Sequence, residues 1–163
     1  MRIAALYGNL PQKEQDAAIA PSVPGVRKIV LATSLAETSL TVEGVQVVVD
    51  SGLMRVPRFS PRSGMTRLET VRVSQASADQ RRGRAGRLGP GICYRLWTVQ
   101  ENRTLEPHHV PEIMEADLAP LALELAAWGA APEDLRWLNP PPAAAYAQRA
   151  DFLFSLRLLM STV

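Results

Sequence analysis

Eight consecutive residues, 80–87, combine the residue types that point most clearly to chemistry, and they read Gln-Arg-Arg-Gly-Arg-Ala-Gly-Arg. Arg84 and Arg87 are three positions apart, so a helix would present both on one face. Two such guanidinium groups can meet a polyphosphate together, and an arginine that neutralises a transferring γ-phosphoryl group is worth roughly 10³ to 10⁵ in rate. Gly83 and Gly86 would allow close approach of that ligand. The alternative is a solvated basic helix end.

The positive charge of the chain is concentrated around this run. The 163 residues carry 18 Lys and Arg against 16 Asp and Glu, a net charge of +2, which by itself favours neither a nucleic-acid-binding tail nor a membrane-surface protein. Residues 55–87, however, contain nine arginines against only Glu69 and Asp79. The basic charge is therefore focused in one segment.

Cysteine and histidine usage favours a reducing compartment and no metal site. Cys93 is the single cysteine, which excludes an internal disulfide, and the adjacent His108 and His109 lack metal-ligand spacing. No apolar run approaches the roughly 20 residues of a membrane helix. We expect a cytoplasmic protein without a membrane partner.

The elements that must position the arginine run follow from the apolar pattern. Near-continuous apolar runs at 3–7, 28–33 and 45–50 alternate with predicted helices at 11–19 and 35–39, which indicates a parallel α/β sheet covered by helices on both faces. The 47% hydrophobic content is enough for one sizeable core.

Between this sheet and the arginine run, residues 53–74 predict a β-hairpin with a basic, exposed tip at 60–64. The run itself is predicted as a helix over 77–87, with Ser77 as a possible cap, followed by a strand at 92–97. The hairpin arginines fit phosphate contact, and the alternative is a solvated edge protected by charge.

Beyond residue 104 the composition becomes acidic and rich in Ala and Leu, which predicts a second, mainly helical unit. One helix ends at Gly129 and another covers 143–159. Their predicted apolar positions are Leu118, Leu121, Leu125 and Trp128 on the first helix, and Phe152, Leu156 and Leu159 on the second.

Three motifs carry a family resemblance. Residues 80–87 match the sixth motif of superfamily-two helicases of the DEAH-box type, residues 31–41 look like the fifth, and residues 48–52 look like the strand after it. The chain therefore resembles the C-terminal RecA-like domain of these helicases, most closely the bacterial HrpB group. The resemblance covers residues 6–97 and continues more weakly into what resembles the following winged-helix region. It implies a RecA-like domain over 1–103 and the start of a winged-helix segment over 104–163.

The resemblance also implies roles for individual residues. Arg84 and Arg87 correspond to the arginine fingers, and Gln80 to the residue that positions the attacking water or the γ-phosphate. The resemblance also turns Ser39 and Thr41 towards the nucleotide cleft, and it implies that Gly83 binds the nucleotide. The implied contacts to the RNA backbone are Thr33, Arg58, Arg62 and, as a structural or RNA-facing residue, Arg81. Helix capping by Thr33 or Ser34 is the alternative reading of that segment.

The implied activity needs a partner domain. The chain has two lysines, neither in a phosphate-binding G-x-x-x-x-G-K-[ST] pattern, and it has no Asp-Glu-x-His sequence. ATP with Mg²⁺ would be held by a first RecA-like domain, so we expect a fragment of an ATP-dependent RNA helicase that is inactive alone and acts on single-stranded RNA with that domain. The alternative is a stand-alone RNA- or partner-binding module without catalysis.

Overall fold

The computed structural model describes residues 1–38 and 42–156 and divides the chain into two compact units. Unit 1 comprises Met1–Val56 and Thr70–His109, and unit 2 comprises Pro57–Glu69 and Val110–Val163. The chain passes from one unit to the other three times, after Val56, after Glu69 and after His109. The outer part of the hairpin belongs to unit 2.

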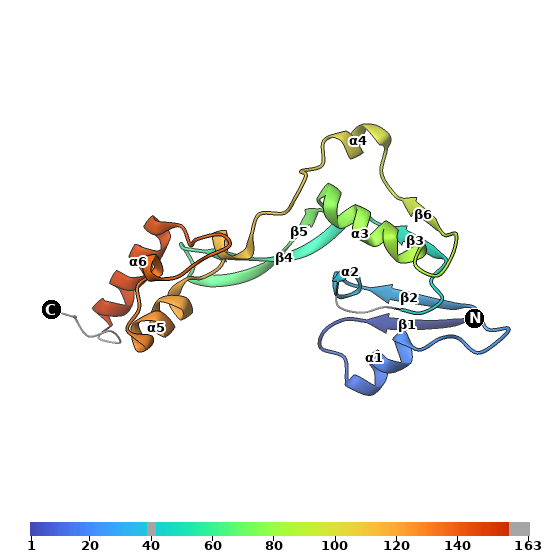
Figure 1. The fold of residues 1–163 in the computed structure, drawn as a ribbon, viewed down its shortest axis with the longest axis horizontal. Helices are drawn as coiled ribbons and strands as arrows, with labels where there is room; N and C mark the ends of the chain where they lie inside the picture. Colours follow the sequence, from blue (N-terminus) through green and yellow to red (C-terminus); the bar gives the residue numbers. More distant parts are fainter. Residues whose placement is uncertain (39–41, 157–163) are drawn as a thin grey trace. The chain divides into compact units, whose positions relative to one another are not determined.

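Unit 1 contains the predicted parallel strands (Figure 1). Strand β1 pairs with β2, with Leu6 opposite Ala32, and β3 pairs with β6, with Asp50 opposite Arg95, both in parallel. The predicted α/β fold is thereby confirmed. The elements of this unit are β1 (Arg2–Leu6), α1 (Gln12–Ile19), β2 (Lys28–Ala32), α2 (Leu35–Thr38), β3 (Val47–Asp50), α3 (Gln75–Ala85), β6 (Ile92–Arg95) and α4 (Val99–Arg103).

Helix α3 is anchored in the buried core of unit 1. Ala78 on this helix is fully buried with Val73 and Leu105, and Met54 and Trp97 pack against the cluster. Since these residues come from four separate segments, the core joins the hairpin base, the helix, the stretch after β6 and the stretch after α4.

The hairpin is formed by β4 (Leu53–Ser60) and β5 (Met65–Arg72), as predicted. At its tip the backbone N–H groups of Ser63 and Gly64 both donate to the Ser60 carbonyl, at 3.2 and 2.9 Å. Gly64 has φ +65°, a conformation that favours glycine and explains the residue at this turn.

Unit 2 is mainly helical, with η1 (Glu112–Met114), α5 (Ala119–Trp128), η2 (Pro132–Asp134) and α6 (Ala143–Ser155). Helix α5 packs against α6, and it ends at Gly129, which adopts a left-handed φ of +76°. Leu118 and Leu125 are buried as predicted, but Trp128 is 72% exposed.

The predicted apolar face of α6 is wrong. Leu153 is the buried residue of this helix, whereas Phe152 and Leu156 are about half exposed, and Leu159 lies outside the described residues. Leu156 is the C-terminal cap of the helix, which ends at Ser155. On the same helix, the Nε of Arg149 lies 3.3 Å from Asp117 Oδ1, and its guanidinium lies 4.4 Å from the centre of the Phe59 ring.

Candidate functional site

The arginine run lies on α3, and neighbouring segments hold the start of this helix. The side chain of Ser74 caps the helix by accepting from the backbone N–H of Ser77 at 3.2 Å, so the predicted cap at Ser77 is wrong. The backbone N–H groups of Gln75 and Ala76 donate to the carbonyls of Glu106 and Pro107, at 2.8 and 3.1 Å. Protein acceptors therefore already occupy the first amides of the helix.

A histidine completes this anchoring. The backbone N–H of Ser74 donates to Nε2 of His109 at 3.2 Å, which requires that this nitrogen be unprotonated. In the described ranges, 1–38 and 42–156, no group of three or more His, Cys, Asp or Glu side chains is placed to hold a metal ion. The imidazole of His109 accepts a hydrogen bond from the Ser74 backbone N–H and so helps to hold the start of α3.

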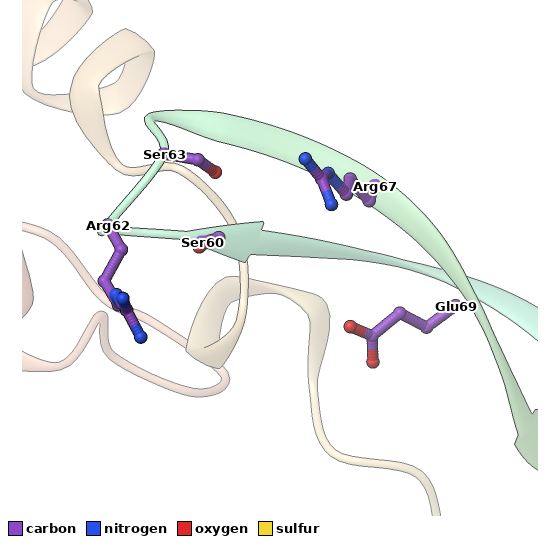
Figure 2. A pocket seen from close by; sticks show the side chains of 5 residues that line it. All are labelled: Ser60, Arg62, Ser63, Arg67 and Glu69. Carbon is purple, nitrogen blue, oxygen red and sulfur yellow. The ribbon is translucent and has the colours of Figure 1, made fainter.

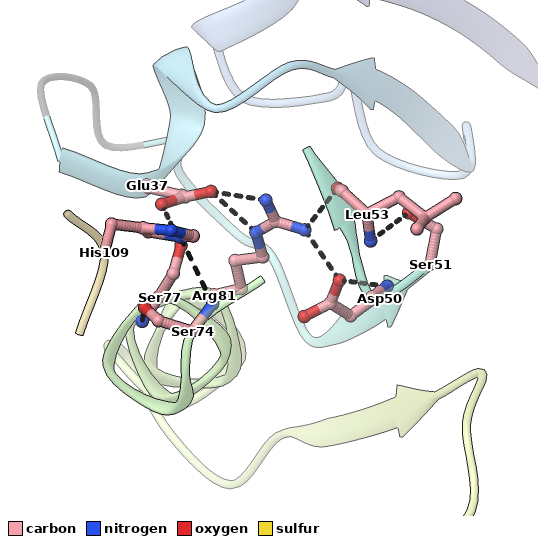
Figure 3. A network of polar contacts seen from close by, with 9 residues as sticks. Glu37, Asp50, Ser51, Leu53, Ser74, Ser77, Arg81 and His109 are labelled. Carbon is pink, nitrogen blue, oxygen red and sulfur yellow. Dashed lines mark hydrogen bonds and ion pairs between the residues drawn. The ribbon is translucent and has the colours of Figure 1, made fainter. Parts of the chain in front are cut away.

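Arg81 is the centre of a polar network that joins three segments (Figure 3). Its Nε donates to Glu37 Oε1 at 2.7 Å and its Nη1 to Asp50 Oδ1 at 2.8 Å. Nη1 also donates to the carbonyl of Leu53 at 3.1 Å, and Nη2 lies 2.6 Å from Glu37 Oε1. The Ser77 hydroxyl donates to the other oxygen of Glu37, Oε2.

Asp50 lies deepest in this network. Its side chain is fully buried, and its Oδ1 also accepts from the backbone N–H of Gly52 at 3.0 Å. Its Oδ2 is buried and has no hydrogen-bond partner among the residues that the structure describes. The Arg81 guanidinium is therefore the cation that offsets this buried charge.

The predicted finger residues are not all on the helix. Helix α3 ends at Ala85, so Arg84 is in its last turn and Arg87 follows it, which corrects the predicted helix end at 87. Arg84 is half-buried, while Gln80 and Arg87 are exposed. Burial and then the nearby positive charge of Arg87 lower the pKa of Arg84, which Glu37 partly counteracts.

Arg87 is therefore one of the charges that act on Arg84, and the two arginines are three positions apart at the end of α3. Among the residues that the structure describes, none comes within 4 Å of the place where a Cβ of Gly83 would lie.

The structure describes only some of the other residues that are predicted to contact nucleotide or RNA. Thr33 is exposed just beyond the carboxyl end of β2, and its backbone N–H donates to the Leu6 carbonyl at 3.1 Å. Ser39 and Thr41 lie outside the described residues. Among the described residues of the segment, Thr33 and Ser34 are the exposed polar residues that directly follow this parallel strand.

Arg62 lies at the hairpin tip beside a shallow hollow of about 430 Å³ (Figure 2). Arg58 lies further down β4, with its Nη2 at 3.2 Å from Glu115 Oε1 and its Nη1 at 3.5 Å from Glu69 Oε2. Arg58 and Arg62, the two predicted RNA contacts on the hairpin, thus differ in their surroundings, because the Arg58 guanidinium already faces two carboxylates. The residues that line the hollow are Ser60, Arg62, Ser63, Arg67 and Glu69.

Cys93 is half-buried in β6, and burial raises the pKa of its thiol, which disfavours the nucleophilic thiolate. No helix within the described part of the chain has the length and apolar character needed to cross a membrane.

The fold and the arginine-bearing helix define a helicase C-terminal domain. Residues 1–89 match the helicase conserved C-terminal domain family, and the chain belongs to it. It is similar to the ATP-dependent RNA helicase HrpB of Escherichia coli (strain K12), with 50% identity over 141 residues, 86% of this chain and 17% of HrpB. The predicted resemblance to DEAH-box helicases of the HrpB type is confirmed.

Two more comparisons agree. The Probable ATP-dependent RNA helicase DHX34 of Homo sapiens is 39% identical over 144 residues, covering 88% of this chain and 13% of that protein. A crystal structure of Escherichia coli DEAH/RHA helicase HrpB has a TM-score of 0.88 at 44% identity, covering 98% of this chain and 21% of that one. The chain thus spans between 13% and 21% of the length of these relatives.

Sequence reasoning did not identify Glu37, Asp50 and His109 as residues that position α3. Glu37 lies inside the fifth motif and Asp50 ends a strand, so each carried a local signal. The residues of α3 that bind Glu37 are 40 and 44 positions away from it along the chain, and no local pattern reveals that pairing.

Proposed function

We propose that this chain is the second RecA-like domain of an ATP-dependent RNA helicase and that it supplies Arg84 and Arg87 to ATP held by a first RecA-like domain. The observation that carries the proposal is the pair of arginines in and just after the last turn of α3, close enough for Arg87 to lower the pKa of Arg84. A polyphosphate would relieve the repulsion between two such guanidinium groups.

Within this function each predicted residue has a chemical task. Arg84 and Arg87 offset the charge that develops on the γ-phosphoryl group, and Gln80, exposed on the same helix, orients the attacking water. Ser39, Thr41 and Gly83 would contact the nucleotide, and acidic residues of the first domain would hold Mg²⁺.

The RNA track runs over a separate set of residues. Thr33, at the end of β2, and the hairpin residues Arg58 and Arg62 contact phosphates of a single strand. Domain closure on ATP and reopening after hydrolysis would then move the two RecA-like domains along the strand.

The test is RNA-stimulated ATP hydrolysis by the 163-residue chain, alone and after addition of a first RecA-like domain as a separate polypeptide. The first domain of Escherichia coli HrpB is a suitable source, because HrpB is 50% identical to this chain over 141 residues. We expect hydrolysis only in the mixture, and a loss of roughly 10³-fold or more with Arg84→Ala at unchanged RNA affinity.

Arg82→Ala is the matched control, because Arg82 lies on the same helix with a side chain 62% exposed and paired with Asp79 at 3.4 Å. It should leave hydrolysis at the wild-type rate. Equal losses of hydrolysis and RNA affinity with Arg84→Ala would make Arg84 an RNA ligand. A silent mixture that still binds RNA in a salt-sensitive way would favour a binding module without catalysis.

A further inference from the structure

Arg81 lies on the same face of α3 as Arg84 and Ser77. The spacing of four positions from Ser77 to Arg81 and three from Arg81 to Arg84 places the three side chains in one row along the helix. Two members of this row, Ser77 and Arg81, hold the two oxygens of Glu37. The row therefore ties α3 to α2, directly before the residues that the fifth motif would turn towards the nucleotide.

The same side chain ties α3 to the end of β3. Arg81 Nη1 bridges Asp50 Oδ1 and the Leu53 carbonyl, at 2.8 and 3.1 Å. Asp50 is at the carboxyl end of its strand and is fully buried. One guanidinium thus joins the finger-bearing helix, α2 and the end of β3 at a single point (Figure 3).

We infer that Arg81 is a positioning residue that holds α3, and with it Arg84, at a set distance from α2 and the end of β3, and that it is not an RNA ligand. This inference rests on the proposed function of Arg84 only where it predicts that a change at Arg81 alters ATP hydrolysis.

The environment of Arg81 argues against a phosphate contact. The Arg81 side chain is 15% exposed, and the side chains of its partners Glu37 and Asp50 are 10% and 0% exposed. With two carboxylates around one guanidinium, the trio carries a formal negative charge that repels a phosphate. A phosphate that captured Arg81 would also leave a buried carboxylate without its cation.

Arg84 is linked to the same trio. The negative charge of Glu37 raises the pKa of Arg84, against the lowering by burial and by Arg87. Glu37 is therefore near enough to act on the finger electrostatically, and Arg81 and Ser77 fix where that carboxylate lies.

The first measurement compares Arg81→Lys with wild type in RNA-stimulated hydrolysis by the chain with the first RecA-like domain. Lysine keeps the positive charge but lacks the planar fork that reaches two carboxylates and a carbonyl. We expect kcat to fall on the order of 10²-fold, as for a displaced catalytic group, with RNA affinity and its salt dependence unchanged. Arg82→Lys, the matched control, should change neither quantity.

The second measurement is amide hydrogen exchange of residues 75–85 in the chain without RNA or nucleotide. We expect faster exchange in Arg81→Lys and wild-type exchange in Arg82→Lys. This readout needs no activity, so a wild-type mixture that fails to hydrolyse ATP would contradict the proposed function while the exchange data still decide the role of Arg81.

Glu37→Gln covers the case in which Arg81→Lys does not fold, because it keeps the shape of the side chain and removes its charge. A positioning role predicts lower kcat with unchanged RNA affinity. An RNA-binding role predicts tighter RNA binding and a steeper salt dependence, because Arg81 would be released from a carboxylate. Tighter binding with Glu37→Gln, or an Arg81→Lys variant with wild-type kcat and weaker RNA binding, would overturn the inference.

Discussion

Gly52 follows the end of β3 in a conformation and a space that suit only glycine. Its φ is +74°, and a Cβ built on it would lie 2.8 Å from Cε3 of Trp97. The Trp97 ring is held in place, since its Nε1 donates to Asn102 Oδ1 at 3.1 Å and the Arg95 guanidinium lies 5.5 Å from its centre. The backbone N–H of Gly52 also helps to bind Asp50.

Gly52→Ala should therefore destabilise the chain through both strain and overlap. We expect the free energy of unfolding to fall by about 2–4 kcal/mol, combining a left-handed residue with an overpacked contact. Urea unfolding of wild type and variant measures it. Gly25→Ala is the control, because Gly25 has φ +80° but nothing within 4 Å of its Cβ position. Equal losses from the two substitutions would show that Trp97 does not press on Gly52.

At the scale of elements, α4 is held by a capping box. The hydroxyl of Thr98 accepts from the Glu101 backbone N–H at 3.1 Å, and Glu101 Oε2 accepts from the Thr98 backbone N–H at 2.7 Å. Arg72, at the end of β5, donates to Glu101 Oε1 at 3.1 Å. These hydrogen bonds lower the pKa of Glu101 to about 2, with the Thr98 backbone as the largest cause.

This box predicts a pH dependence of stability. Because the folded pKa of Glu101 lies below its ordinary value of 4.5, its contribution is complete above about pH 4.5 and is lost as the pH falls through about 2. The free energy of unfolding should thus decrease more steeply over this range in wild type than in Glu101→Gln. Chemical denaturation at several pH values measures it.

Glu124→Gln serves as the control for that experiment, since Glu124 is exposed on α5 and takes no part in the box. It should keep the steep dependence. A Glu101→Gln variant with the wild-type dependence would contradict the role of the box.

The hairpin gives a prediction about salt dependence. Arg62 lines the hollow at the tip, whereas Arg58 faces Glu69 and Glu115. We expect Arg62→Ala to flatten the dependence of log affinity for single-stranded RNA on log salt by about 0.7, the value for one phosphate contact. Arg58→Ala should flatten it less, because its carboxylate partners already offset part of its charge. An unchanged slope with Arg62→Ala would remove the tip from the RNA path.

At the scale of the whole molecule, each unit has its own buried residues. Leu6, Val73 and Ala78 are buried in unit 1, and Leu125 and Leu153 in unit 2. Apolar burial is the main favourable term for each unit, so each should respond to substitutions in its own core.

Leu125→Ala should accordingly loosen α5 and α6 and leave α3 unaffected. The expected cost is about 2–5 kcal/mol, because a buried leucine loses its contacts and leaves a cavity. Amide hydrogen exchange of 119–128 and 75–85 measures the two units separately. Leu6→Ala is the reciprocal variant and should loosen unit 1 alone. Equal acceleration in both helices would show a single cooperative unit.

Much of the fold was predictable because it depends on short-range patterns. The apolar runs predicted β1, β2 and β3 to within two residues, and Gly129 ended α5 as expected. The sequence predicted Ser77 as the cap of α3, whereas Ser74 is the cap in the structure. Serine is a good cap at either position, so residue type alone does not decide between them. The face of α6 was misplaced because the sequence pattern predicted a helix to residue 159, whereas the helix ends at Ser155 and Leu156 is its cap.

By itself, the sequence determined the class of the protein and the placement of Arg84 on a helix that follows the β-hairpin. Such features need only residue types and spacing within one segment. The tertiary structure decided what each arginine touches: Arg58 meets Glu115, and Arg81 meets Glu37 and Asp50, which are 44 and 31 positions away. The physical reason is that a guanidinium takes its role from acceptors within about 3 Å, and folding brings those acceptors from distant segments.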